Sequence, residues 1–507
     1  MLEFDWKQFK SGTDIRGVAV EGVPGQKYNL TDEAVRRMTA GFLLWLSNRL
    51  GKPANELKLA VGHDSRISAD RIQKAVVDAM LAAGVHVLVC GLASTPSMFM
   101  ITVDWDCDGS VQITASHHPY YRNGLKFFTK DGGLDGSDIE QILDFAAGNR
   151  TPAFGKGEAE IVDYMKRYSE ILRDKIKEGV KAEDYEHPLK GFHIVVDAGN
   201  GAGGFYATDV LEPLGADISG SQFLEPDGMF PNHIPNPENE AAMQSVCLAT
   251  VRAKADLGVI FDTDVDRGGA VDERGDELNR NRLVAVASAI ALEGNPGGTI
   301  VTDSITSSGL KEYIEQTLGG RHHRFKRGYR NVINEALRLN REGVNCPLAI
   351  ETSGHAALRE NYFLDDGAYL VTKIIIKLAV LRREGKKLED LLAGLREPAE
   401  ATELRMAISD PDFRACGNRV IDGLEQWAKS HGWQIAPDNY EGIRVSFGKG
   451  EGEGWFLLRL SVHDPILPLN VESDTAGGVR VILEKLHEYL KTCEGIDISP
   501  VESFLAR

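Results

Sequence analysis

The chain has 507 residues, an ordinary hydrophobic content of 42% and a formal net charge of −18. A length of this order predicts three or four domains, and the hydrophobic content suffices for a large core. The acidic balance, with no run of Lys and Arg, argues against nucleic acid or an anionic membrane surface as a partner.

Cysteine usage and the absence of long apolar segments bear on where the protein works. The six Cys residues are scattered without a C-x-x-C pair, which argues against a zinc ribbon or a disulfide framework and favours a reducing compartment. The first residues are not typical of a signal peptide, and the most apolar stretch, 374–381, is too short to span a bilayer. We expect a soluble, cytoplasmic protein.

In chain order, one pattern recurs three times: an apolar run ending in Asp, a loop, a helical stretch and then Gly. The first copy predicts strands over 59–64 and 85–90 around a helix over 69–83. The second predicts strands over 194–197 and 216–218 around a helix ending at Leu214. The third predicts a strand over 300–303 and a helix ending at Leu318. Each copy is typical of a βαβ unit.

Three such copies predict three related α/β domains with mainly parallel sheets. The last part differs, because it predicts a helix over 418–429 followed by short strands with hairpin-like turns. We interpret it as a smaller α+β domain. The expected domains are 1–160, 161–277, 278–396 and 397–507.

The stretch 109–119 carries a candidate nucleophile. Residues 109–114 alternate like a half-buried strand, which ends at Ala115-Ser116-His117-His118-Pro119. Pro119 stiffens the turn, so Ser116 is held at a strand end, and Lys126 follows closely enough to bring a cation toward it. The alternative is an ordinary surface turn.

The stretch 257–267 predicts a metal site. An apolar strand leads directly into Asp262, Asp264 and Asp266, whose oxygens can turn onto one hard cation, Mg²⁺ or Ca²⁺. A match to EF-hand spacing is accidental, because Arg267 stands where that loop needs Gly. The alternative is a hairpin of solvated Asp. Three carboxylates with no Lys partner would repel one another unless a cation were present.

Three further stretches allow two interpretations each. The turn 199–204 fits the dinucleotide fingerprint, but no acidic residue completes it, so we favour a plain Gly-rich turn. Glu351 and Ser353 follow an apolar run and could bind two sugar hydroxyls or begin a helix. Arg459 and Ser461 point to the same side of a strand end, which suits a phosphate or a charged edge strand.

Together and in this order, the motifs resemble those of the α-D-phosphohexomutase family. The serine motif T-A-S-H-x-P matches 114–119, the metal loop D-x-D-x-D-R matches 262–267, and the sugar loop G-E-x-S-G-H matches except that Ile350 replaces Gly. An N-terminal match around Arg16 is one residue short. In the final phosphate loop, His463 and Asp464 replace the usual residues, and Tyr329 stands where some members carry a catalytic His.

The resemblance implies four domains around a central cleft and a phosphohexomutase that moves phosphate between the 1- and 6-positions of glucose or mannose phosphate. A phosphoserine and a bisphosphate would be its intermediates. The alternatives are a phosphoglucosamine mutase, a sugar-phosphate phosphatase or a non-catalytic sugar-phosphate-binding protein. The expected partners are the hexose phosphate and the hexose bisphosphate, without nucleic acid or membrane. The oligomeric state, the preferred sugar and the general acid/base are not assigned.

The resemblance also implies a set of site residues. The implied catalytic residues are Ser116, His117, Lys126, Arg267 and Arg16. The implied ligands of Mg²⁺ are Ser116, Asp262, Asp264 and Asp266. The implied substrate-binding residues are Glu351, Ser353, His355, Arg459, Ser461, His463, Lys326 and Tyr329.

Overall fold

The computed structural model describes residues 5–461 and 464–507, and the chain forms two compact units. The first unit comprises Met1–Ile290 and Ser353–Leu391, and the second comprises Ala291–Thr352 and Leu392–Arg507. The domain boundaries expected near residues 160, 277 and 396 stay predictions.

The N-terminal part of the first unit is built on a mixed eight-stranded sheet with the order β1-β2-β6-β5-β3-β4-β8, and β7 pairs with β6. Its strands are β1 (Lys10–Ser11), β2 (Asp14–Val18), β3 (Lys58–His63), β4 (His86–Leu92), β5 (Gly109–Ile113), β6 (Arg122–Thr129), β7 (Gly132–Gly133) and β8 (Glu158–Ile161). Strand β3 is parallel to β4 and β5, whereas β6 is antiparallel to β5. The loops that follow β3 and β5 therefore leave the same edge of the sheet.

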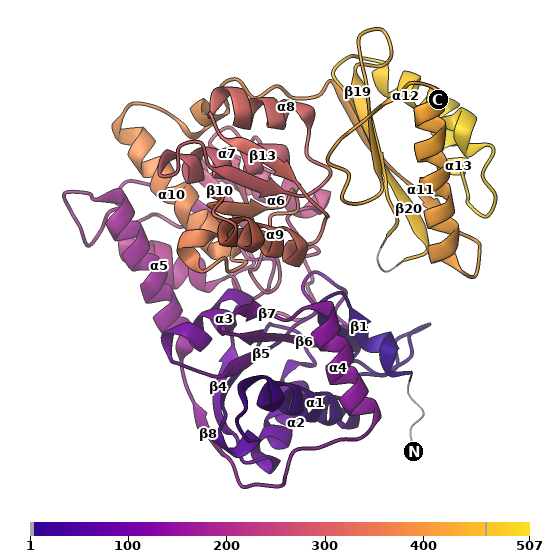
Figure 1. Cartoon of the computed structure of the whole chain (residues 1–507). Coiled ribbons are helices and arrows are strands. Elements are labelled where there is room, and N and C mark those ends of the chain that lie inside the picture. The colour runs from indigo at the N-terminus through magenta and orange to yellow at the C-terminus, as the bar shows by residue number, and fades with distance from the viewer. Residues whose placement is uncertain (1–4, 462–463) are drawn as a thin grey trace. The chain divides into compact units, whose positions relative to one another are not determined.

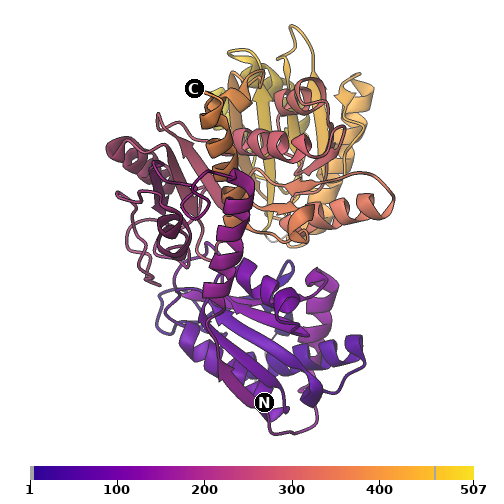
Figure 2. The same ribbon diagram turned by 90° about the vertical axis from the view of Figure 1, so that its left-hand side faces the viewer.

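Helices cover both faces of this sheet. They are η1 (Trp6–Phe9), α1 (Asp32–Leu50), η2 (Ala54–Glu56), α2 (Ala69–Ala82), α3 (Thr95–Asp104), α4 (Gly136–Ala147) and α5 (Tyr164–Val180). Helices α1, α2 and α4 lie together on one face and α3 lies on the other (Figure 1). Figure 2 shows the same sheet, in indigo and purple, with helices on its two sides. The strands and the helix expected over 59–90 are confirmed to within a residue or two.

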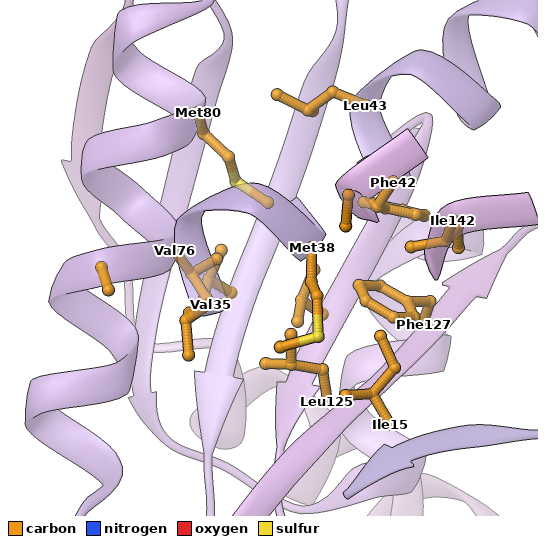
Figure 3. Packing of buried hydrophobic residues seen from close by; sticks show 14 of the residues in the cluster. Ile15, Val35, Met38, Phe42, Leu43, Val76, Met80, Leu125, Phe127 and Ile142 are labelled. Atoms are coloured by element: carbon orange, nitrogen blue, oxygen red, sulfur yellow. The ribbon is translucent and has the colours of Figure 1, made fainter. Parts of the chain in front are cut away.

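The core of this part forms where α1 packs on the sheet. Helix α1 is capped at its start by Thr31, whose side chain accepts the Ala34 N–H, and at its end by Gly51 with φ +65°. Its buried face carries Phe42, whose ring lies 4.5 Å from that of Phe127 on β6, centroid to centroid. Figure 3 shows this ring pair among the aliphatic side chains of the core.

The remainder of the first unit contains a three-stranded sheet, β11-β10-β9, whose β10 is parallel to β9 and antiparallel to β11. Its elements are β9 (Ile194–Asp197), η3 (Tyr206–Leu211), η4 (Glu212–Leu214), α6 (Glu240–Ala253), β10 (Leu257–Phe261), β11 (Gly268–Asp272), α7 (Asn281–Glu293), β15 (Ala356–Leu358), η6 (Arg359–Asn361), α10 (Gly367–Arg383) and η7 (Leu388–Leu392). Helices α5 and α10 meet where the buried Tyr168 hydroxyl donates to both oxygens of Asp366, each at 2.7 Å.

The second copy of the repeat differs from the expectation. After β9 the chain forms a π-helix, η3, and a short 3-10 helix, η4, in place of one α-helix. Pro213 lacks an N–H and therefore disfavours a continuous α-helix. The expected strand over 216–218 is reduced to a single bridge between Asp217 and His193.

The second unit begins with parallel strands in which β12 (Thr299–Thr302) pairs with both β13 (Arg321–Arg324) and β14 (Leu348–Ile350). The connecting helices are α8 (Ser308–Glu312), η5 (Tyr313–Thr317) and α9 (Tyr329–Arg341). The helix expected to end at Leu318 is thus α-helical only at its start, and its last turn is a π-helix.

The C-terminal part of the second unit is an antiparallel five-stranded sheet with the order β16-β20-β19-β18-β17. Its elements are β16 (Glu400–Ala407), α11 (Phe413–Ser430), β17 (Gln434–Ile435), β18 (Ile443–Phe447), β19 (Gly454–Leu458), β20 (Ile466–Ser473), α12 (Gly478–Leu490) and α13 (Ser499–Leu505). The three helices lie on one face of this sheet (Figure 1). The α+β character expected for this part is confirmed.

None of the helices in the part of the chain that the structure describes combines the length and the apolar character needed to cross a membrane.

Replacing Phe42 by Ala should lower the free energy of unfolding of the N-terminal part by about 3–5 kcal/mol, because it opens a cavity against Phe127. Trp45, whose ring lies 6.2 Å from that of Phe42, gives a local fluorescence signal for a urea titration. Leu50, 41% exposed on the same helix, is the control, and its Ala variant should stay within about 0.5 kcal/mol of the wild type. Equal urea midpoints for Phe42→Ala and Leu50→Ala would contradict the proposed packing of Phe42 against Phe127.

Candidate active site

Ser116 lies on the turn that follows β5 and is 5% exposed. Its backbone N–H donates to Thr114 Oγ1 at 2.9 Å, and its hydroxyl donates to Asp262 Oδ2 at 2.9 Å. Its φ is +49°, a left-handed conformation that is uncommon for a residue with a side chain. The hydroxyl is therefore held in one direction, toward the loop that follows β10.

That loop connects β10 to β11 and carries Asp262, Asp264 and Asp266, all of them buried. One oxygen from each carboxylate lies within 4.8 Å of the others. Among the residues that the structure describes, Asp264 Oδ1 and Asp266 Oδ1 are buried without a hydrogen-bond partner. Clustered carboxylates with orphaned oxygens suit a divalent cation, so these residues fit a metal site.

Lys126, on β6, reaches the same carboxylates. Its Nζ donates to Asp264 Oδ2 at 3.0 Å and to Asp266 Oδ2 in a shorter contact. The expectation that the three carboxylates have no Lys partner was therefore wrong. The partner is distant in sequence and is brought in because β6 lies beside β5 in the sheet.

The carboxylates are not equivalent in their protonation. Burial, together with the neighbouring Asp266 and Asp264, raises the pKa of Asp262 well above its ordinary value. Burial would also raise the pKa of Asp266, but Lys126, His355 and Arg267 outweigh it and hold the value below the ordinary range. Asp262 is therefore more readily protonated than Asp266.

Two histidines follow the serine. Burial and the positive charge of Arg267 lower the pKa of His117 to about 2, and burial and Arg16 lower that of His118 to about 3. Both rings are therefore neutral at physiological pH. His117 Nδ1 lies 3.3 Å from Ser116 Oγ, close enough for a hydrogen bond with the hydroxyl.

Arg267 and His355 form a buried relay that ends on Asp365. Arg267 Nε donates to His355 Nε2 at 2.9 Å, and His355 Nδ1 lies 2.6 Å from Asp365 Oδ2. Because Nε2 accepts from Arg267, the neutral ring carries its proton on Nδ1 and donates it to Asp365. Burial lowers the pKa of His355, but the Asp365 carboxylate outweighs this and raises it.

Two residues of this neighbourhood did not figure in the sequence expectations. Asp365 stands in an Asp-Asp pair just before α10, which could have marked it as a polar helix start. Arg66 donates to backbone carbonyls of the serine turn, and Arg16, which was expected, donates to the carbonyl of Thr114. Two arginines, Arg16 and Arg66, thus donate to backbone carbonyls in and next to the serine turn.

The remaining expected residues divide between the two units. Ser353 belongs to the first unit, where its buried Oγ has no hydrogen-bond partner in the described residues. Glu351, Lys326, Tyr329, Arg459 and Ser461 belong to the second. His463 lies outside the described residues.

In the second unit, Glu351 follows β14 and accepts the backbone N–H of Gly328 at 2.6 Å. Its neighbour Thr352 donates its hydroxyl to Asp303 Oδ2 at 2.8 Å. Burial and the adjacent Glu351 raise the pKa of Asp303 to about 7. The loop after Glu351 is therefore tied to the end of β12.

Arg459 and Ser461 follow β19 in the same unit. Burial lowers the pKa of Arg459, and its Nε has no hydrogen-bond partner in the described part of the chain. Ser461 Oγ accepts the N–H of Asp464 at 3.3 Å. Lys326 is exposed, and Tyr329 is the first residue of α9.

Comparison with known proteins decides the family. Models of the three α/β/α domains of phosphoglucomutase/phosphomannomutase match residues 7–151, 170–275 and 279–398. The chain belongs to this family. The resemblance drawn from the motifs and the expected fold class, three α/β domains and a C-terminal α+β domain, are both confirmed, with sheets that are mixed.

Individual relatives align with most of the chain. A phosphomannomutase/phosphoglucomutase of Pseudomonas syringae pv. tomato is 29% identical over 469 residues, covering 92% of this chain and 94% of that protein. A phosphoglucomutase of Neisseria meningitidis is 29% identical over 428 residues, covering 84% and 86%. The crystal structure of a family member from Burkholderia thailandensis has a TM-score of 0.78 at 26% identity, covering 96% and 97% of the two chains.

Replacing Asp264 by Asn should weaken the binding of a divalent cation, because it removes a carboxylate whose Oδ1 is buried without a partner. Isothermal titration with Mg²⁺ and with Mn²⁺ measures the loss directly. Asp276, exposed in the turn after β11, is the matched control, and its Asn variant should bind like the wild type. Equal affinities for Asp264→Asn and the wild type would show that the loop does not bind the ion.

Proposed function

We propose that this chain is a phosphohexomutase that moves a phosphoryl group between the 1- and 6-positions of a hexose phosphate. One observation carries the proposal: the hydroxyl of Ser116, a buried residue, donates to Asp262 of the carboxylate loop. A serine held next to a cation site is suited to take up and release a phosphoryl group. Membership of the phosphoglucomutase/phosphomannomutase family supports the same reaction.

In this proposal Ser116 carries the phosphoryl group in the resting enzyme. It passes the group to the free hydroxyl of the hexose phosphate, which gives a hexose bisphosphate and a free serine. The bisphosphate then returns its other phosphoryl group to Ser116 and leaves as the isomer. Mg²⁺, favoured by an all-oxygen donor set from Asp262, Asp264 and Asp266, would offset the charge on the phosphoryl oxygens when bound.

The chain supplies further charge and hydrogen bonds around the serine. Lys126, Arg267 and Arg16 are the proposed sources of positive charge as the phosphoryl group moves. Because the Ser116 hydroxyl donates to Asp262, the neutral ring of His117 can donate its Nδ1 hydrogen to Ser116 Oγ and so orient it.

The substrate-binding residues are proposed from the motifs of the family. Glu351 and Ser353 suit sugar hydroxyls, and Arg459 with Ser461 suits the phosphate that does not react, with Lys326 and Tyr329 as further contacts. We include His355, although both of its ring nitrogens are engaged with Arg267 and Asp365, so a bond to substrate requires one of these to be exchanged. His463 is proposed on the motif alone.

The family names favour glucose and mannose phosphates as substrates, with glucosamine phosphate as the alternative. We propose a cytoplasmic location, which the six free cysteines support. An assay of the three sugar 1-phosphates with Mg²⁺ and a trace of sugar bisphosphate separates the substrates. Net release of inorganic phosphate in that assay would instead indicate a phosphatase.

Replacing Ser116 by Ala should lower kcat by on the order of 10⁴-fold or more, because the residue that carries the phosphoryl group is lost. Intact-mass measurement should find one phosphate on the wild type and none on the variant. Ser137, exposed on α4, provides a matched control, whose Ala variant should keep both activity and phosphate. Wild-type turnover by Ser116→Ala would overturn the proposed function.

Replacing Arg459 by Ala should raise KM for the hexose phosphate by about 10- to 100-fold, since a hydrogen bond to a charged group contributes roughly 1.5–3 kcal/mol. The steady-state assay that gives KM also gives kcat, which should fall less. Arg419, paired with Asp410 on the exposed side of α11, is the control. An unchanged KM would remove Arg459 from the phosphate site and leave the serine chemistry untouched.

A further inference from the structure

Arg66, in the loop between β3 and α2, is 2% exposed, and all five of its side-chain N–H groups are engaged. One donates to the carboxylate of Asp64, at 3.2 Å from Nε. The other four donate to backbone carbonyls of the serine turn: Pro119 at 2.8 Å and Arg122 at 3.0 Å from Nη1, and His118 at 2.6 Å and Ser116, in a shorter contact, from Nη2.

The carboxylate beside Arg66 continues this network to the other side of the serine. Thr114 Oγ1 donates to Asp64 Oδ2 at 2.6 Å and accepts the Ser116 N–H at 2.9 Å. The carbonyl of Ser116 is thus bound by Arg66, and its N–H is bound through Thr114 to the partner of Arg66. Both peptide groups that flank the serine side chain are fixed from one buried ion pair.

Such fixing is needed because of the backbone conformation of Ser116. Its φ of +49° is left-handed, a conformation that is unfavourable for a residue with a Cβ. Conformations of this kind persist only where the surroundings over-determine them. Four charge-assisted hydrogen bonds to one turn supply that constraint.

Residues 227–230 pack against Arg66 and shield it from solvent. The ring centroid of Phe230 lies 5.2 Å from Arg66 Cζ. A Cβ on Gly228 would lie 2.4 Å from both Ile67 N and Ser65 O, so this loop packs directly against the backbone around Arg66. Buried in this way, the guanidinium strengthens its bonds to the turn, because water does not compete for them.

We propose that Arg66 is a positioning residue for phosphoryl transfer: its guanidinium holds the Ser116–Arg122 turn in the conformation that aims Ser116 Oγ at the carboxylate loop. The inference rests on the proposed function, which it deepens by naming what orients the nucleophile. Lysine cannot take this part, because it has three donors on a flexible stem in place of a planar fork with five.

Replacing Arg66 by Lys keeps the charge and removes the fork. We expect kcat to fall by about 10²-fold, the effect of a misplacement of about 1 Å at a reacting atom. KM should change little, because all five N–H groups of the Arg66 side chain bond to groups of the protein and none is left for substrate. Hydrogen exchange of the backbone amides in 116–122 should accelerate.

Arg71 provides the matched control, because it too donates to two backbone carbonyls, Ala19 and Leu30, and pairs with Asp32, away from the serine turn. Arg71→Lys should leave kcat and exchange in 116–122 as in the wild type, whatever it does to stability. Unchanged exchange in Arg66→Lys, or faster exchange with an unchanged kcat, would overturn the inference.

A second pair of variants decides the matter if Arg66→Lys does not fold. Thr114→Val preserves the shape of the side chain but breaks the link from Asp64 to the Ser116 N–H, whereas Thr114→Ser preserves the hydroxyl. We expect a lower kcat and faster exchange in the Val variant and near wild-type behaviour in the Ser variant. Equal kcat values for the two would count against the network.

The two hypotheses fail in different ways. Full activity of Ser116→Ala ends the proposed function, while the exchange measurement still reports whether Arg66 orders the turn. If Ser116→Ala is inactive and Arg66→Lys turns over at the wild-type rate, the function stands and the role of Arg66 is excluded.

Discussion

Three buried carboxylates on one short loop are the constraint on which the first unit depends. Asp262, Asp264 and Asp266 lie in a low-dielectric interior, where their mutual repulsion is large unless positive charge and donors offset it. Lys126 bonds to two of them, and Thr95, the first residue of α3, donates its hydroxyl to Asp264 Oδ2 at 2.5 Å. A lysine of β6 and the first residue of α3 therefore supply donors that offset the negative charge of this loop.

The same charge balance explains how the serine and the loop depend on one another. A phosphoserine adds nearly two negative charges, and Ser116 Oγ is only 2.9 Å from Asp262. Burial and the other carboxylates already raise the pKa of Asp262, so a further negative charge beside it is unfavourable without a compensating cation. The orphaned oxygens of Asp264 and Asp266 point to a divalent cation as the element that makes a phosphorylated serine compatible with this loop.

The features that sequence reasoning recovered are local ones. Ser116 at a strand end, the carboxylates after β10 and the first repeat each follow from a few neighbouring residues whose periodicity or chemistry is diagnostic. The features it missed depend on tertiary contacts. The π-helical segments η3 and η5 have no distinct local pattern, and the bond from Lys126 to Asp266 joins residues far apart in the chain.

The position of Arg66 illustrates which tertiary contacts strand order would have predicted. Strands β3 and β5 are parallel neighbours, so the loops that follow them must meet at one edge of the sheet. An Asp at the end of one strand and an Arg two residues later, as in Asp64 and Arg66, form a local ion pair whose spare donors face the adjacent loop. The repeat predicted β3 and β4 but did not place β5 beside β3; knowledge of that pairing would have placed Arg66 close to the serine turn. Its five hydrogen bonds could not be predicted from the sequence, because residue types do not encode the directions of backbone carbonyls.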